Sequence, residues 1–241
     1  EIAAKAFEFT DVYCRAQEKR SRHDFVGEKE LCDRLGQIRD ALLEEYEYPM
    51  LNPRHARLFL NRFTTDYFFP EVSGFSRVTD GNERIVAFDN EWQFLLDPQF
   101  WGRYAGFHRA ESAGGNWRKI RTDTSWSNQG LRYYFGQAWY RQTVVVPEGY
   151  EGRKIKIWFS GVDNTAEVWV NGEFVGANHD GVEFDLNAFG SAFRPFEFDV
   201  SDAIRHGEAN VVTIRAVRPR TNEIGTGGLV GPVMLYAASQ E

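Results

Sequence analysis

Cysteine, long apolar runs and an excess of basic charge are what this 241-residue sequence has least of. Cys14 and Cys32 are its only cysteines. They could bridge two antiparallel helices or be buried thiols, and we favour the thiols because cysteine is often a small core residue. No apolar run approaches the roughly 20 residues that span a bilayer, which argues against a membrane partner. The net charge of -7 argues against a nucleic-acid partner, because phosphate binding requires a basic surface.

Several catalytic motifs are also missing. The five histidines are scattered, without a pair four residues apart and without nearby cysteines, so we expect no zinc site. No serine lies in a Gly-x-Ser-x-Gly turn. The glycines between Gly225 and Gly228 precede no helical pattern, so they do not predict a phosphate-binding loop. The sequence therefore gives no sign of zinc, serine-nucleophile or nucleotide chemistry.

The first 70 residues carry a helical pattern. Apolar residues recur at helical spacing between Ile2 and Ala16 and again between Leu31 and Leu43, with charged residues between them. Asn52, followed by proline, predicts the start of a third helix. We therefore predict a segment of two to three helices over residues 1–70 and a linker over residues 71–85.

From about residue 86 the pattern changes to short strands separated by turn residues. The predicted strands cover residues 138–146, 154–159, 166–170, 173–175, 196–200, 211–217 and 233–236. Asn171-Gly172 predicts a type I′ hairpin, because that turn requires positive φ at both central residues. Strands without intervening helices predict a mainly β fold, an antiparallel sandwich or jelly roll over residues 86–241. The aromatic content of 15% suits such a core and also suggests a sugar ligand, because aromatic faces stack on pyranose rings.

A series of motifs in this second part carries a family resemblance. In order, they are Trp117-Arg118-Lys119-Ile120, Ala138-Trp139-Tyr140-Arg141-Gln142, Phe159-Ser160-Gly161-Val162-Asp163, the run from Ala166 to Gly176, His179-Asp180-Gly181, the run from Phe196 to Ser201, and the run from Gly227 to Val233. In this order and spacing, residues from about Phe88 to Ala237 resemble the sugar-binding domain of glycoside hydrolase family 2. This domain is the galactose-binding-like jelly roll of β-galactosidases and β-glucuronidases. The chain departs from the family in an inserted loop from Val182 to Pro195, and at Gly231, where the family usually has Trp or Arg.

The resemblance implies a non-catalytic part of a larger glycoside hydrolase. Family 2 enzymes take their catalytic carboxylates, one of them in an Asn-Glu pair, from a separate barrel domain, and hydrolysis normally requires two carboxylates. This chain has such pairs at Asn90-Glu91 and Asn222-Glu223. We interpret both as solvated loop pairs, because no alternation of strands and helices predicts a barrel around them. We therefore expect no catalytic residue in this chain.

The resemblance does not cover residues 1–70. This helical segment is only vaguely similar to the helices that follow a catalytic barrel in some glycosidases, so a tail of a preceding catalytic domain is one interpretation of it. The resemblance implies an extracellular or periplasmic parent, although this piece does not determine its compartment. The chain starts at Glu1 rather than Met, so we expect a piece of a longer protein. We expect no cofactor. A structural calcium ion, common in galactose-binding-like folds, stays an open alternative, with Asp163, Asp180 and Asp185 as contributors.

Sugar-binding residues are expected in the loops at one end of the sandwich, because sheet faces bury their side chains. The strand residues Trp139, Trp158 and Trp169 are therefore expected to pack, as are Trp92 and Trp117. The loop 126–134 combines aromatic rings with amide and guanidinium groups, the mixture that a sugar site requires. The arginines after residue 217 would hold a carboxylate or sulfate in a two-point contact. The predicted carbohydrate-binding residues are Trp101, Tyr104, Trp126, Asn128, Tyr133, Tyr134, His179, Asp180, Arg218 and Arg220.

Two functions stay open at this point. The first is a carbohydrate-binding module, which the loop 126–134 favours. The second is a structural module that braces and completes the active site of a neighbouring catalytic barrel. The inserted loop favours the second, because exposed phenylalanines such as Phe184, Phe189 and Phe193 usually contact a protein. The expected partners are a carbohydrate or a catalytic domain of the same parent chain.

Overall fold

The computed structural model describes residues 2–22, 24–45, 81–111, 114–179, 195–219 and 227–239. The chain divides into two compact units, residues 1–77 and residues 78–241. The predicted third helix after Asn52 lies outside the described residues, as does nearly all of the inserted loop with its three phenylalanines.

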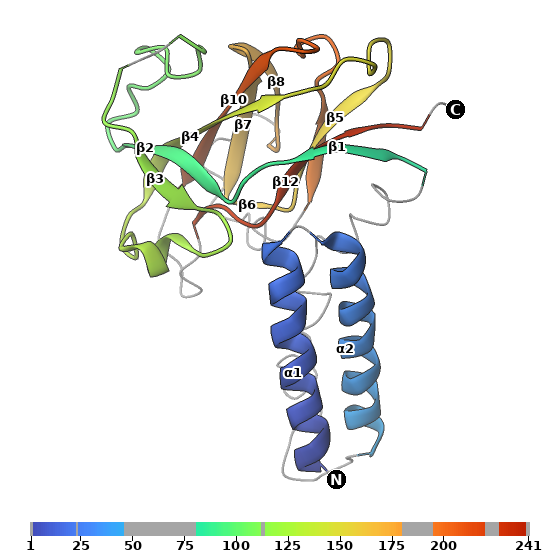
Figure 1. Ribbon diagram of the computed structural model, residues 1–241. Helices are drawn as coiled ribbons and strands as arrows, with labels where there is room; N and C mark the ends of the chain where they lie inside the picture. The colour runs from blue at the N-terminus through green and yellow to red at the C-terminus, as the bar shows by residue number, and fades with distance from the viewer. Residues whose placement is uncertain are drawn as a thin grey trace. The chain divides into compact units, whose positions relative to one another are not determined.

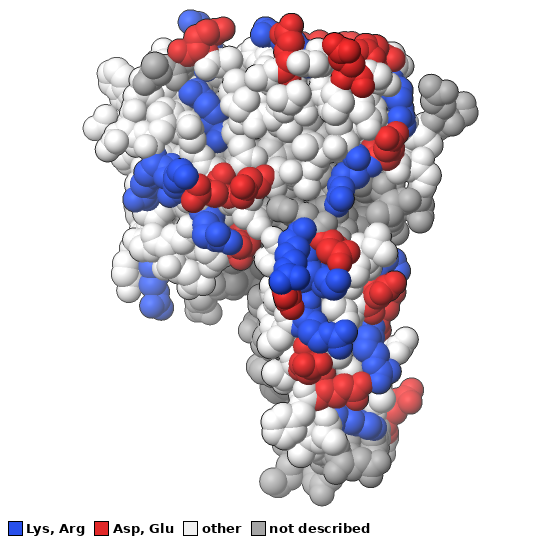
Figure 2. Space-filling view, viewed as in Figure 1, with Lys and Arg blue, Asp and Glu red and all other residues white. Residues whose placement is uncertain are grey.

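The first unit contains two long helices that pack against each other (Figure 1). α1 spans Ile2–Ser21 and α2 spans Phe25–Glu45. The carboxylate of Asp24 accepts a hydrogen bond from Gly27 N at 3.0 Å and so satisfies one of the amides left unpaired at the start of α2. The buried apolar side chains of the two helices are Val12, Ala16, Cys32, Leu35 and Ile38. Acidic and basic side chains alternate over the outer surface of this helix pair (Figure 2). Neither of the two described helices is apolar enough to cross a membrane.

Neither cysteine forms a disulfide. Cys32 is buried, as predicted, but Cys14 is exposed, so the expectation of a buried thiol is wrong for Cys14. The reason is helical geometry. Cys14 lies two positions from each of the buried residues Val12 and Ala16, and a separation of two residues in a helix is a rotation of roughly 200°. The thiol therefore faces away from the partner helix.

The second unit is an antiparallel β-sandwich, which confirms the predicted fold class. One sheet has the order β1 (Glu83–Ala87), β12 (Val233–Ala237), β5 (Ile155–Phe159) and β9 (Phe196–Asp199). The other has the order β3 (Arg118–Arg121), β2 (Glu91–Asp97), β4 (Gly136–Val145), β10 (Ala209–Arg218), β7 (Thr165–Val170) and β8 (Glu173–Ala177). A short pair joins β11 (Gly228–Leu229) to β6 (Val162–Asp163), and the 3₁₀ helix η1 spans Trp126–Gln129. The first strand begins at Glu83, within the segment predicted as a linker.

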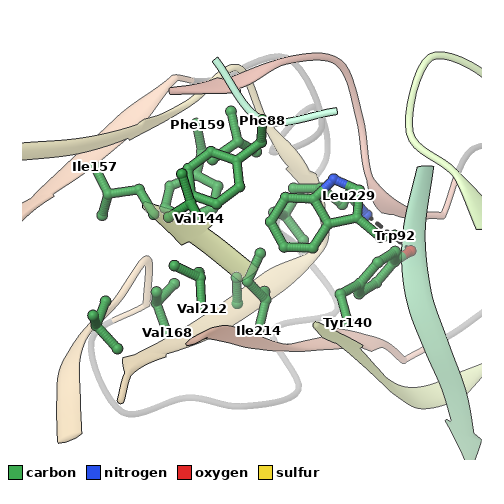
Figure 3. Close-up of a cluster of buried hydrophobic side chains, with 14 of the residues drawn as sticks. Phe88, Trp92, Tyr140, Val144, Ile157, Phe159, Val168, Val212, Ile214 and Leu229 are labelled. Atoms are coloured by element: carbon green, nitrogen blue, oxygen red, sulfur yellow. Dashed lines mark hydrogen bonds between the residues drawn. The ribbon is translucent and has the colours of Figure 1, made fainter. Parts of the chain in front are cut away.

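The core lies between the two large sheets and follows from the two-residue period of the strands. In β4, Ala138, Tyr140 and Val144 point into the core, while Trp139 belongs to a separate cluster on the other face of the sheet. Figure 3 shows Tyr140 and Val144 packed with Trp92, Phe159 and other residues of both sheets. The tryptophans predicted to pack within strands are indeed buried: Trp139, Trp158 and Trp169 are each at most 6% exposed.

The Asn171-Gly172 turn joins β7 to β8 as predicted. Asn171 has φ 54° and Gly172 has φ 85°, the positive values that a type I′ turn requires. The side chain of Asn171 also holds the neighbouring segment, because its Oδ1 accepts from Val211 N at 3.0 Å and its Nδ2 donates to Ala203 O at 2.8 Å.

The Asn90-Glu91 pair lies at the start of β2. Asn90 is buried, and its carbonyl oxygen accepts a hydrogen bond from Thr122 N at 2.9 Å. The interpretation as a solvated pair is therefore wrong for Asn90. Glu91 is exposed and pairs with Lys119 on β3 across the strands. The second pair, Asn222-Glu223, lies outside the described residues.

Candidate functional site

One end of the six-stranded sheet gathers the loops in which sugar-binding residues were predicted. β2 ends at Asp97, which pairs with Gln137 at the start of β4. β10 ends at Arg218, which pairs with Gly136. Because the strands are antiparallel, the loop that leaves β2 and the segment that enters β4 emerge side by side. Figure 1 shows the loop after β2 as a long excursion beyond the strand ends, in green.

Exposed aromatic rings concentrate in these two segments. We call Phe100, Trp101 and Tyr104, from the loop after β2, together with Tyr133 and Phe135, from the segment before β4, the aromatic end. The exposed fraction is 65% for Trp101, 92% for Tyr104 and 79% for Tyr133. Three of the predicted residues thus expose most of their surface in the described structure and can meet a ligand from solvent.

Trp126 and Arg218 lie deeper than expected. Trp126 is 1% exposed; its ring packs edge-on against Phe94, and its Nε1 donates to the hydroxyl of Tyr140 at 2.5 Å. Arg218 is also 1% exposed, and its Nη1 donates to Tyr134 O at 3.1 Å. Burial lowers the pKa of Arg218 below its usual value, and the charge of nearby Asp163 acts in the opposite direction.

Tyr134 links the segment before β4 to the sheet. Its hydroxyl donates to Gln137 O at 2.5 Å, and its ring lies against that of Trp126. Burial raises the pKa of Tyr134 to about 12, and the charge of Asp97 also raises it. Tyr134 is therefore neutral at neutral pH and acts as a hydrogen-bond donor to the backbone.

Of the four remaining predicted residues, two lie among the described residues and two do not. Asn128 is exposed on η1, where its Nδ2 donates to Thr124 Oγ1 at 3.1 Å. His179 follows β8, and its Nε2 lies 3.8 Å from Glu167 Oε1. Asp180 and Arg220 lie outside the described residues.

The sequence did not single out Asp97, although the structure makes it the anchor of the loop that bears Trp101. The carboxylate of Asp97 accepts hydrogen bonds from Trp101 N at 2.9 Å and Gly102 N at 2.7 Å. It also accepts one from Trp139 Nε1 at 3.0 Å. An acidic residue at a strand end, directly before Pro98, was the available signal, because such side chains commonly accept hydrogen bonds from the amides of the turn that follows.

Within the described residues, no group of three or more His, Cys, Asp and Glu side chains lies close enough to hold a metal ion. Asp163 is among them, but Asp180 and Asp185 are not, so the calcium alternative stays a prediction.

The fold and its end loops define the class of the second unit: an antiparallel sandwich that presents its loop side chains at one end, an architecture that sugar-binding lectin domains also use. Residues 118–222 match the family described as glycosyl hydrolases family 2, sugar binding domain. This match confirms the resemblance seen in the motifs.

Individual relatives agree with this assignment. The chain is 34% identical over 100 residues to a β-galactosidase of Thermoanaerobacter pseudethanolicus, which covers 41% of this chain and 12% of the relative. It is 31% identical over 130 residues to a β-glucuronidase of Paenibacillus borealis, which covers 51% of this chain and 19% of the relative. The crystal structure of Ruminococcus gnavus β-glucuronidase matches with a TM-score of 0.54 and 18% identity, over 65% of this chain and 29% of that one. This last likeness shows the fold alone. The chain thus spans less than a fifth of these two curated relatives.

Proposed function

We propose that this chain is a non-catalytic carbohydrate-binding module of a larger glycoside hydrolase, and that it contacts glycan through the aromatic end. The family of residues 118–222 supports a sugar as the ligand class. The relatives named β-galactosidase and β-glucuronidase support a glycoside hydrolase as the parent. The observation that carries the proposal is the exposure of Trp101, Tyr104 and Tyr133 at one end of the sandwich. A cluster of large exposed rings is typical of a binding surface.

The predicted residues divide between contact and support. The exposed rings would stack on the sugar, whereas Trp126, Tyr134 and Arg218 would hold the segment that bears Tyr133. The guanidinium of Arg132 lies 5.8 Å from the centre of the Tyr133 ring, so a positive charge accompanies this ring and would favour an acidic sugar. Asn128, His179, Asp180 and Arg220 stay predicted contributors from the neighbouring loops.

Glycan binding by the purified chain tests the proposal. An array that contains galactose-terminated and glucuronic acid-terminated oligosaccharides should give a positive signal for at least one class. Trp101→Ala and Tyr104→Ala should each weaken binding by about 5- to 30-fold, since one stacked ring contributes about 1–2 kcal/mol. Phe7→Ala is the matched control, because Phe7 is a 77% exposed ring on α1. Equal losses in all three variants, or none, would contradict the assignment of the site.

A structural role beside a catalytic domain is the second candidate, and the same exposed rings favour it, because they suit a protein surface as well as a sugar. Failure of the chain to bind any glycan on the array would favour this brace. Under both proposals the chain hydrolyses nothing by itself. Turnover of p-nitrophenyl β-D-galactoside or glucuronide by the purified chain would contradict both.

A further inference from the structure

A row of polar side chains is buried on the outer face of the six-stranded sheet, outside the apolar core. Asp97, Gln137, Arg215 and Glu167 come from four neighbouring strands, in the order β2, β4, β10 and β7. Each is at most 6% exposed. Burying charged and amide groups is costly unless each group is paired, so their partners matter.

These side chains bond to one another in sequence. Gln137 Nε2 donates to the carboxylate of Asp97, and Arg215 Nε donates to Gln137 Oε1. Arg215 Nη1 donates to Glu167 Oε2 at 2.7 Å. We call these four residues the buried polar chain. It crosses the sheet at the end where the aromatic loops emerge.

Both ends of the buried polar chain hold the same loop. At one end, Asp97 accepts the backbone amides of Trp101 and Gly102. At the other, Glu167 accepts a hydrogen bond from the guanidinium of Arg103. Gly102 lies so close to the sheet that a Cβ on it would come within 2.2 Å of Trp139 Nε1. Three consecutive residues, 101–103, are thus fixed to the sheet.

We propose that the buried polar chain is a positioning device that holds the loop with Trp101 and Tyr104 in the conformation that binds ligand. The identity of the ligand rests on the proposed function, but the order of the loop does not. Hydrogen bonds are directional, whereas apolar packing of equal volume would stabilise the sheet without fixing the loop. An ordered loop also strengthens binding, because the apparent dissociation constant rises in inverse proportion to the fraction of molecules that are competent to bind.

Hydrogen exchange of the intact chain tests the positioning role without any ligand. In Asp97→Asn, one carboxylate oxygen becomes an NH₂ group that faces other donors, so the amides of Trp101 and Gly102 should exchange at least about tenfold faster. The amides of Tyr140 and Ile214, in the middle of β4 and β10, should keep the protection of the unmodified chain. Asp123→Asn is the control, because Asp123 pairs with Arg121 outside the buried polar chain.

Arg103→Gln tests the other end and keeps the proposal falsifiable where Asp97→Asn does not fold. Arg103 is 47% exposed, so the substitution leaves the sheet intact while it removes the contact of the loop with Glu167. We expect faster exchange at residues 101–104 only. Unchanged hydrogen exchange at these residues would overturn the proposal. An equally large increase in the exchange rate at Tyr140 and Ile214 would also overturn it, because the buried polar chain would then stabilise the whole sandwich.

The two proposals fail separately. Faster loop exchange in a chain that binds no galactose- or glucuronic acid-terminated oligosaccharide would leave the positioning role intact and overturn the glycan site. If Trp101→Ala weakens glycan binding but loop exchange is unchanged in Arg103→Gln and in folded Asp97→Asn, the glycan site stands. The positioning role is then overturned.

Discussion

The hydroxyl of Tyr140 offers the sharpest test of the packing at the aromatic end. It accepts hydrogen bonds from Trp126 Nε1 at 2.5 Å and from Leu229 N at 3.2 Å, in a site where all three residues are at most 1% exposed. Burial raises the pKa of Tyr140 above its usual value, so the group stays neutral. Tyr140→Phe leaves two buried N–H groups without an acceptor, and each unsatisfied group costs about 1–3 kcal/mol of stability. We expect the free energy of unfolding to fall by about 2–6 kcal/mol, a large part of the 5–15 kcal/mol that is usual for a domain.

Urea unfolding followed by tryptophan fluorescence measures this loss. All seven tryptophans lie between residues 92 and 169, so the signal reports on the sandwich unit alone. With a denaturant dependence of about 2 kcal/mol/M, the middle of the usual range, the urea midpoint should fall by about 1–3 M. Tyr133→Phe is the control, because that ring is exposed and its loss should change stability by less than about 0.5 kcal/mol. Equal midpoints for the two variants would refute the hydrogen-bond argument.

Two further predictions concern the same end of the sandwich. Gly228→Ala should lower the free energy of unfolding by about 1–3 kcal/mol more than Gly130→Ala. Both glycines have positive φ, but a Cβ on Gly228 would come within 2.0 Å of the Tyr140 hydroxyl, while one on Gly130 meets nothing within 4 Å; equal urea midpoints would contradict this. The sandwich should also lose stability as the pH rises from about 10 to about 12. The pKa of Tyr134 is raised to about 12 in the folded chain. Its contribution to the free energy of unfolding is therefore complete below the unfolded pKa near 10 and is lost as the pH rises toward 12. In a titration followed at 295 nm, Tyr134→Phe should remove the step near pH 12, and a step that persists would show that Tyr134 does not cause it.

The strands were predictable because their signal is local. In β4 and β10, β-branched and aromatic residues stand between turn residues, and the Asn171-Gly172 pair fixes one hairpin by its own backbone preference. The structure shifts the ends of the predicted strands by at most two residues and adds β1, β2, β3, β6 and β11. β2 was missed because it begins at Glu91 of the Asn90-Glu91 pair, whose polar residues indicated a loop. The exposed positions of the loop rings were predictable in kind, since loops lie at the surface.

Which loop aromatic is exposed was not predictable, because loops have no period that tells inward from outward. Trp126 and Tyr133 lie in one polar-aromatic run, yet η1 turns the first into the core and leaves the second in solvent. The buried polar chain was hidden for a related reason. Gln137, Glu167 and Arg215 alternate with core residues, the usual pattern of strands with one face in water. The contrary signal was the run Ala138-Trp139-Tyr140, which is apolar on both faces of β4 and so indicates a sheet covered on both sides. Because the outer face is covered, polar residues of those strands require hydrogen-bond partners within the protein. For Asp97 and Glu167, the loop that bears Trp101 provides such partners.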